Sequence, residues 1–193
     1  IANVVVWLRP DSDDPTAAFS PEKLPATKVR DHLVQAGPGG FNPRILLTRA
    51  GDRVEFANPT PIAFNVFFRQ PVQANEQIGA ETGEFNVLLP AGQIHTTKPL
   101  VAHRRLASVS DMIHPWVHAY VWAFDHPYFA VTDEKGNFAI PDVPAGKYRL
   151  MMWQEKVGYR DGAKGRLGLR ITLRGEKSMN LGRVVLSSPN WDK

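Results

Sequence analysis

Short apolar runs separated by prolines and glycines constrain the fold of this chain more than any other feature. Runs rich in Val, Ile, Leu, Phe and Tyr recur along the sequence, and 16 prolines and 15 glycines interrupt them. Residues 119–124 are typical, because small or branched residues alternate there with aromatic ones, as in a strand buried on both faces. β-branched and aromatic residues favour strands, whereas Pro and Gly end them. No convincing amphipathic helix is present. The sequence therefore predicts an all-β protein.

The apolar runs give about a dozen candidate strands. They are residues 4–8, 44–47, 53–56, 64–68, 84–89, 119–124, 128–132, 137–140, 147–153, 167–173 and 181–186, with one or two more within 93–110. Residues 9–31 are polar and rich in proline, and residues 69–83 are polar. We expect both segments to be long connections between strands.

Composition narrows the class of protein further. Hydrophobic residues make up 43% of the 193-residue chain, which is enough for a sizeable core. The net charge of +4 comes from small basic groups with no recognition helix or stacking platform, so we expect no nucleic-acid partner. No apolar stretch is long enough for a transmembrane helix. Because the chain starts on Ile1, we expect a removed export signal and a periplasmic or extracellular location.

Motifs of catalysis are missing from the sequence. There is no cysteine, no Gly-x-Ser-x-Gly elbow, no His-Glu-x-x-His pair and no phosphate-binding loop. The carboxylates show no pairing that would indicate glycosidase chemistry. We therefore predict that the protein is not an enzyme.

Two stretches carry a family resemblance. The run at 110–117, Ser-Asp-Met-Ile-His-Pro-Trp-Val, resembles the C-terminal metal loop of plastocyanin-like (cupredoxin) proteins, and residues 58–66 resemble the segment around their first copper-binding histidine. Residues 114–133 are similar to a secreted bacterial group that joins this loop to a carboxypeptidase-regulatory-like, or transthyretin-like, unit. The turn at 132–138 and the strand at 143–150 carry the motifs of that unit.

The resemblance implies an all-β chain with a Greek-key β-sandwich fused to a small transthyretin-like β unit. We predict a cupredoxin-like sandwich at residues 1–124 and a carboxypeptidase-regulatory-like unit packed on it at 125–158. Residues 159–193 would form a C-terminal β extension or tail.

The copper ligands that the resemblance implies are largely lost. Phe64 stands at the position of the first histidine, Asp111 at that of the cysteine and Val117 at that of the axial methionine, so only His114 remains. Type 1 copper requires a thiolate, which this chain lacks. The four positions therefore predict a degenerate site that is metal-free and packed shut, with no cofactor.

A harder ion is the alternative to an empty site. Asp111 and His114, with His118 or His126, could supply ligands for Zn²⁺ or copper if they converged on one ion. In an extended segment, however, His114 and His118 would lie about 13 Å apart, which is too far to share one ion. Hydrogen-bonded histidines in a loop are the simpler interpretation.

Two functions from different classes follow. The first is an exported, non-enzymatic accessory or structural subunit that acts by protein–protein contact in a larger assembly. The resemblance makes a redox or respiratory electron transport complex a plausible host, and Trp116, in a loop, is the predicted interaction residue. The alternative is a metal-binding or electron-transfer protein with an unconventional site around Asp111 and His114. Self-association through an exposed edge strand at residues 3–8 is a third prediction.

Overall fold

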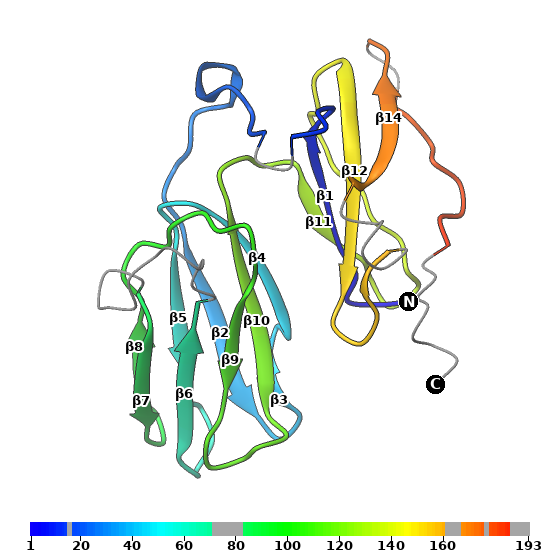
Figure 1. The fold of residues 1–193 in the computed structure, drawn as a ribbon. Helices are drawn as coiled ribbons and strands as arrows, with labels where there is room; N and C mark the ends of the chain where they lie inside the picture. The colour runs from blue at the N-terminus through cyan, green and yellow to red at the C-terminus, as the bar shows by residue number, and fades with distance from the viewer. Residues whose placement is uncertain (15–16, 71–82, 161–166, 176–177, 186–193) are drawn as a thin grey trace. The chain divides into compact units, whose positions relative to one another are not determined.

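The computed structural model shows an all-β chain (Figure 1), as predicted. The structure describes residues 1–14, 17–70, 83–160, 167–175 and 178–185. Most of the predicted connection at 69–83 and parts of the predicted extension at 159–193 lie outside these residues. The chain divides into two compact units, Pro25–Asp125 and a second unit made of Ile1–Leu24 with His126–Lys193.

The unit Pro25–Asp125 contains two sheets. One has the order β4-β10-β9-β6-β7, and the other has the order β3-β2-β5-β8. The strands of the first sheet are β4 (Ile45–Arg49), β6 (Phe64–Arg69), β7 (Phe85–Leu89), β9 (Ala107–Ser110) and β10 (His118–Phe124). Those of the second are β2 (Asp31–Gly37), β3 (Gly40–Asn42), β5 (Arg53–Ala57) and β8 (Ile94–Thr96). The pairs β2–β5 and β4–β10 are parallel, and the others are antiparallel.

Side chains from both sheets form one core in this unit. Val54 and Phe56 of β5 contribute from one sheet, and Val66 and Phe68 of β6 from the other, each with no exposed surface. The side chains alternate along each strand, so every second residue faces the core. The β-sandwich predicted from the resemblance to cupredoxins is therefore confirmed.

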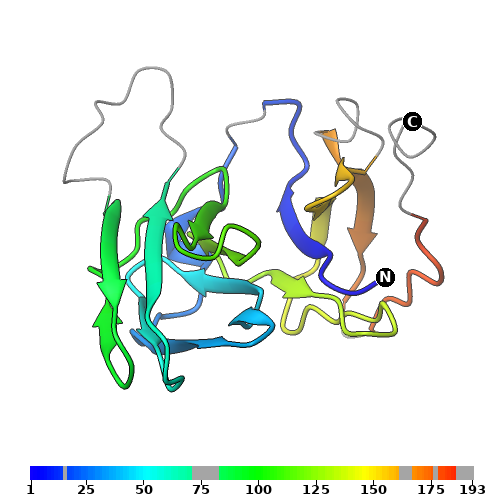
Figure 2. The same ribbon diagram turned by 90° about the horizontal axis from the view of Figure 1, so that it is seen from below.

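The second unit is built on one five-stranded sheet. Its order is β11-β1-β12-β13, and β14 also pairs with β12. The strands are β1 (Val5–Pro10), β11 (Phe129–Val131), β12 (Gly146–Gln154), β13 (Gly158–Tyr159) and β14 (Leu169–Leu173). A separate core packs against this sheet, and it includes Val6, Leu8, Leu150 and Met152. Figure 2 shows the strands of both units from below.

The N-terminal strand corrects two predictions. Val5–Pro10 pairs antiparallel with β11 and with β12, so it is an interior strand of the second unit. The predicted domain at residues 1–124 is therefore wrong in its N-terminal part, because residues 1–24 belong with His126–Lys193. Self-association through an exposed edge at residues 3–8 is also wrong, since both edges of β1 are already paired.

A buried arginine ties the segment after β1 to this sheet. Arg149 on β12 is 5% exposed, and its Nε donates to Asp11 Oδ1 at 2.7 Å. Its Nη2 donates to Asp13 Oδ1 at 2.6 Å, and its Nη1 donates to the carbonyl of Leu167 at 3.2 Å. A buried charge needs such partners because desolvation is costly. Asp11 and Asp13 thus hold the start of the predicted connection at 9–31 against the sheet.

Local differences from the predicted elements have simple causes. The strands β2 and β3 were not predicted, because the sequence 31–42 has only a few apolar residues. Residues 137–140 form no strand, although Phe138 and Ile140 pack against the core of the second unit. The described part of 181–186 is not a strand either, but Leu181 and Val184 contact the same core. In the described ranges, no helix is long and apolar enough to span a membrane.

Candidate functional site

The candidate site is the loop that joins β9 to β10. These strands pair antiparallel, with His118 opposite Ser110, so residues 111–117 form a closed connection at the lower end of the sandwich in Figure 1. The amide of Asp111 donates to the carbonyl of Val117 at 3.1 Å, and the amide of Val117 donates to the carbonyl of His114 at 2.8 Å. The backbone of the loop is therefore held at both ends and across its middle.

Asp111 organises the interior of the loop. Its side chain has no exposed surface, and Oδ1 accepts from the amides of Ile113 at 2.7 Å and His114 at 3.1 Å. Oδ2 lies 2.7 Å from Nδ1 of His114, which donates the hydrogen bond when it carries the proton. These hydrogen bonds replace the contacts with water that the side chain of Asp111 has lost on burial. Asp111 thus acts as a structural anchor.

Phe64 and Val117 lie in the core of the sandwich beside the candidate site. Phe64 is 3% exposed, and its ring centroid lies 4.9 Å from that of His114. Val117 is also 3% exposed and belongs to the core of the sandwich. All four predicted degenerate positions, Phe64, Asp111, His114 and Val117, are therefore brought together.

The residues do not fit a metal ion. Neither Phe64 nor Val117 can donate to copper, and the chain has no cysteine. The 2.7 Å separation of His114 Nδ1 and Asp111 Oδ2 is a direct hydrogen bond. Bonds of about 2.0–2.2 Å to one tetrahedral ion would hold these atoms roughly 3.3 to 3.6 Å apart. In the part of the chain that the structure describes, no three His, Cys, Asp or Glu side chains group together to hold an ion.

His118 and His126 each have other polar partners. Nδ1 of His118 lies 3.0 Å from the carbonyl of Trp116, and its Nε2 contacts the guanidinium of Arg44. His126 belongs to the other unit and is 5% exposed. Its Nδ1 accepts from the amide of Tyr128 at 3.1 Å, and its ring lies against Phe19 at 4.7 Å. Within the sandwich unit, Asp111, His114 and His118 therefore do not group as metal ligands.

The outer side of the loop is apolar and exposed. Trp116 is 70% exposed, Met112 65% and Ile113 49%. The Trp116 ring meets the ring of His114 edge-on, with centroids 5.6 Å apart. Because the loop is anchored from inside by Asp111, these three side chains are presented on a fixed backbone. We call Met112, Ile113 and Trp116 the apolar loop face.

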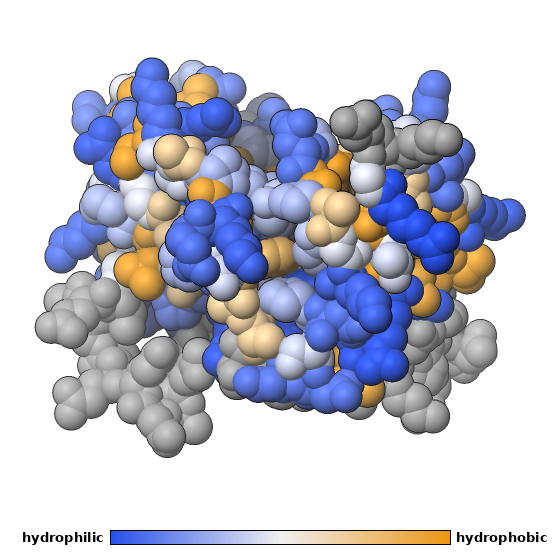
Figure 3. All heavy atoms as spheres, turned by 90° about the horizontal axis from the view of Figure 1, so that it is seen from above, coloured by the Kyte–Doolittle hydropathy of each residue, from blue (hydrophilic) through white to orange (hydrophobic). Residues whose placement is uncertain are grey.

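Sequence reasoning identified Trp116 but missed its two apolar neighbours and the residue that supports them. Asn65 on β6 accepts from the amide of Met112 at 3.3 Å through Oδ1, and its Nδ2 donates to Asn86 Oδ1 at 2.7 Å. The available signal was their place in the same proline-containing loop as Trp116. Elsewhere, the view from above in Figure 3 shows apolar side chains in small groups among polar ones.

The model of one protein family matches part of the chain. Residues 107–161 are similar to the family described as polysaccharide lyase family 4, domain II. The match runs from β9 to just beyond β13 and covers less than a third of the chain, so it does not establish a family. Comparison with curated proteins gives no match.

Solved structures similar to this chain include cupredoxins and a nitrite reductase. A purple cupredoxin from Nitrosopumilus maritimus is 17% identical, with 48% of this chain and 99% of that chain covered and a TM-score of 0.37. Amicyanin from Paracoccus versutus is 17% identical, with 54% and 88% covered and a TM-score of 0.37. The copper-containing nitrite reductase (NirK) from Thermus scotoductus SA-01 is 18% identical, with 53% and 24% covered and a TM-score of 0.40. Similarity at this level supplies no function, which must come from the residues themselves.

Proposed function

We propose that this chain is an exported, non-enzymatic accessory subunit that acts by protein–protein contact through the apolar loop face. The observation that carries the proposal is that Trp116 is 70% exposed on a loop whose interior is fixed by the buried Asp111. Large exposed apolar side chains on an ordered surface are typical of interaction sites. Trp is also among the residues that contribute most to binding energy at interfaces.

Pre-organisation strengthens this argument. Three hydrogen bonds to Asp111 and one from the amide of Val117 to the carbonyl of His114 fix the loop before any partner arrives. Binding of a partner then costs less free energy, because the loop is already ordered. The degenerate ligand set serves as scaffolding for contact in this proposal, and no bound metal is required.

The resemblance to cupredoxins leads us to propose a redox or respiratory assembly in the periplasm or outside the cell as the host. The partners would be other protein subunits of an exported or membrane-associated complex. This step is an analogy, because one fold serves many functions.

Copurification from the natural source tests the proposal. Tagged wild-type protein is compared with Trp116→Ala and with Val29→Ala, a matched control that removes a 57% exposed apolar side chain beside the β4–β5 turn. We expect defined partner subunits with the wild type and Val29→Ala, and a loss of about tenfold or more with Trp116→Ala. Equal recovery with both variants would contradict the role of the loop.

Elemental analysis of the same preparations separates this proposal from a metal-binding or electron-transfer function around Asp111 and His114. We expect less than a tenth of an equivalent of copper or zinc, on the order expected for adventitious metal. Stoichiometric metal that disappears in His114→Ala would overturn the proposal in favour of the metal-binding function.

A further inference from the structure

Strand β7 differs from the other strands that lie at the edges of sheets. Among the described residues, the edge strands β3, β8, β11 and β13 have only two or three residues, and short edges offer little for another chain to pair with. Longer edges are usually protected by charged side chains or prolines. Strand β14 carries Arg170 and is followed by Arg174, and β4 ends at Arg49. The five residues of β7, Phe-Asn-Val-Leu-Leu, include neither a charge nor a proline.

The uncharged stretch extends beyond β7 to the next edge strand. No Asp, Glu, Lys or Arg occurs in residues 85–97, although such residues make up 22% of the chain. Leu88 on β7 is 57% exposed, and Ile94 on β8 is 59% exposed. The ring centroids of Phe85 and His95 lie 4.4 Å apart and connect the two strands. Exposed apolar side chains on an uncharged edge favour contact with another protein surface.

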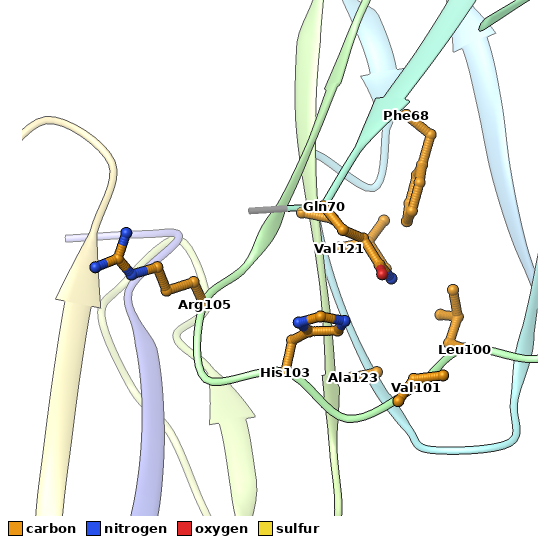
Figure 4. Close-up of a pocket in the computed structure, with 9 residues that line it drawn as sticks. Phe68, Gln70, Leu100, Val101, His103, Arg105, Val121 and Ala123 are labelled. Carbon is orange, nitrogen blue, oxygen red and sulfur yellow. The ribbon is translucent and has the colours of Figure 1, made fainter. Parts of the chain in front are cut away.

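The inner face of β7 is packed and keeps the strand in place. Phe85 stacks on Phe68 of β6, with centroids 5.3 Å apart and an interplanar angle of 2°. Figure 4 shows Phe68 pointing into the pocket that Leu100 and Val121 also line. In the described part of the chain, β7 pairs with β6 alone, so its second edge can accept another strand.

We propose that β7 pairs antiparallel with β7 of a second copy of this chain, and that a two-fold axis relates the two copies. The edge is compatible with itself, because neither copy brings a charge to the contact although each carries a net charge of +4. Homodimer interfaces are also more apolar than other protein interfaces. The assembly closes at two chains, because each copy uses the same edge once. The dimer does not depend on the function of the apolar loop face.

Sedimentation velocity of the whole chain tests the dimer. The concentration runs from about 1 to about 200 µM, which brackets the micromolar Kd expected for a small interface. We expect monomers at the low end of this range and dimers at the high end. A chain that stays monomeric throughout would overturn the proposal. Species that keep growing beyond the dimer would overturn it as well, because a two-fold contact closes.

Matched variants test whether the contact is made by β7. Leu88→Lys adds a charge to each copy, and the two-fold axis places both charges on the same face of the joined sheet, where they repel. Leu33→Lys makes the same change at a 48% exposed position on β2, in the other sheet. We expect Leu88→Lys to weaken dimerisation by about tenfold or more, and Leu33→Lys to leave it unchanged. Equal dimerisation of the two variants would overturn the proposal.

Trp116→Ala separates this contact from the apolar loop face. We expect this variant to dimerise as the wild type does, even if it no longer recovers partner subunits. Loss of the dimer in Trp116→Ala would place the contact on the apolar loop face and overturn the pairing of β7.

Hydrogen exchange in the wild type locates the contact without a substitution. We expect the amides of β7 to exchange more slowly as the concentration rises over the same range, and those of the edge strand β14 to be unchanged. Slower exchange at β14 instead of β7 would contradict the proposed pairing. This measurement stands even if Leu88→Lys does not fold.

Discussion

At the scale of single residues, one buried carboxylate holds the loop 111–117 together. Asp111 forms hydrogen bonds with Nδ1 of His114 and with two backbone amides. These polar groups of the loop therefore have partners within the protein. Phe64 fills the place next to the imidazole with a ring at 4.9 Å. The convergence of these positions is the part of the site that the resemblance predicted and the structure brings together.

Introducing copper-binding side chains at these positions should create a copper site. The combined variant Phe64→His, Asp111→Cys and Val117→Met places a second imidazole, a thiolate and a thioether around His114, which is the donor set of type 1 copper. We expect one equivalent of Cu²⁺ and an intense visible absorption band, measured by metal analysis and spectroscopy. The same variant with His114→Ala is the control and should lose the band. A folded variant that binds no copper would show that the four positions are not close enough.

Asp52 gives a second residue-scale prediction, on pH. It is 2% exposed, and its two oxygens accept from His32 Nε2 at 2.8 Å and from the amides of Arg30 and Arg49 at 3.0 Å each. Burial raises the pKa of Asp52, but these hydrogen bonds outweigh it and hold the pKa below its usual value. The unfolded state therefore takes up the proton first as the pH falls. The contribution of Asp52 to stability is present above about pH 4 and is lost as the pH falls below that value.

Urea denaturation at pH 7 and at pH 3 checks this. Asp52→Asn should cost on the order of 3 kcal/mol at pH 7, because the amide cannot accept all three hydrogen bonds, and clearly less at pH 3. Asp31→Asn is the control, since Asp31 pairs with Arg53 at an exposed position where solvent and salt screen the charges. A cost of Asp52→Asn that does not change with pH would contradict the mechanism.

At the scale of elements, the local sequence pattern predicts where many strands lie but not which strands pair with one another. The sequence predicted strands such as β6 and β10 because their apolar residues alternate or run without interruption. It missed β2, where His32 and Gln35 interrupt the apolar pattern and parallel pairing with β5 supplies the stability. It also could not place Val5–Pro10, because the choice of partner strand depends on contacts more than 100 residues away, such as Val6 with Met152. A short stretch of sequence does not show which distant strand it will pair with.

The candidate site was predictable to a similar degree. The positions of Asp111 and His114 followed from the motif at 110–117, but the hydrogen bond between them depends on the closure of the loop. The exposure of Met112 and Ile113 depends on the burial of Asp111 below them.

At the scale of the whole molecule, the two units have different relations to the chain. Every strand of the sandwich and its entire core come from the continuous segment Pro25–Asp125. The other unit needs both ends of the chain, because β1 lies between β11 and β12 and the bond network of Arg149 requires Asp11 and Asp13. A unit with its own core can fold alone, whereas a sheet that loses an interior strand cannot keep its pairing.

We therefore expect a protein cut to Pro25–Asp125 to fold with a cooperative urea transition and a dispersed amide spectrum. Removal of residues 1–24 from the whole chain should leave the signals of the sandwich in place and abolish those of β11, β12 and β14, because the interior strand of their sheet is gone. The control is the deletion with a peptide of residues 1–24 added back, which should recover part of the lost signals. If the deletion instead unfolded the sandwich, the core of Pro25–Asp125 would depend on the N-terminal segment, and the boundary at residue 25 would be incorrect.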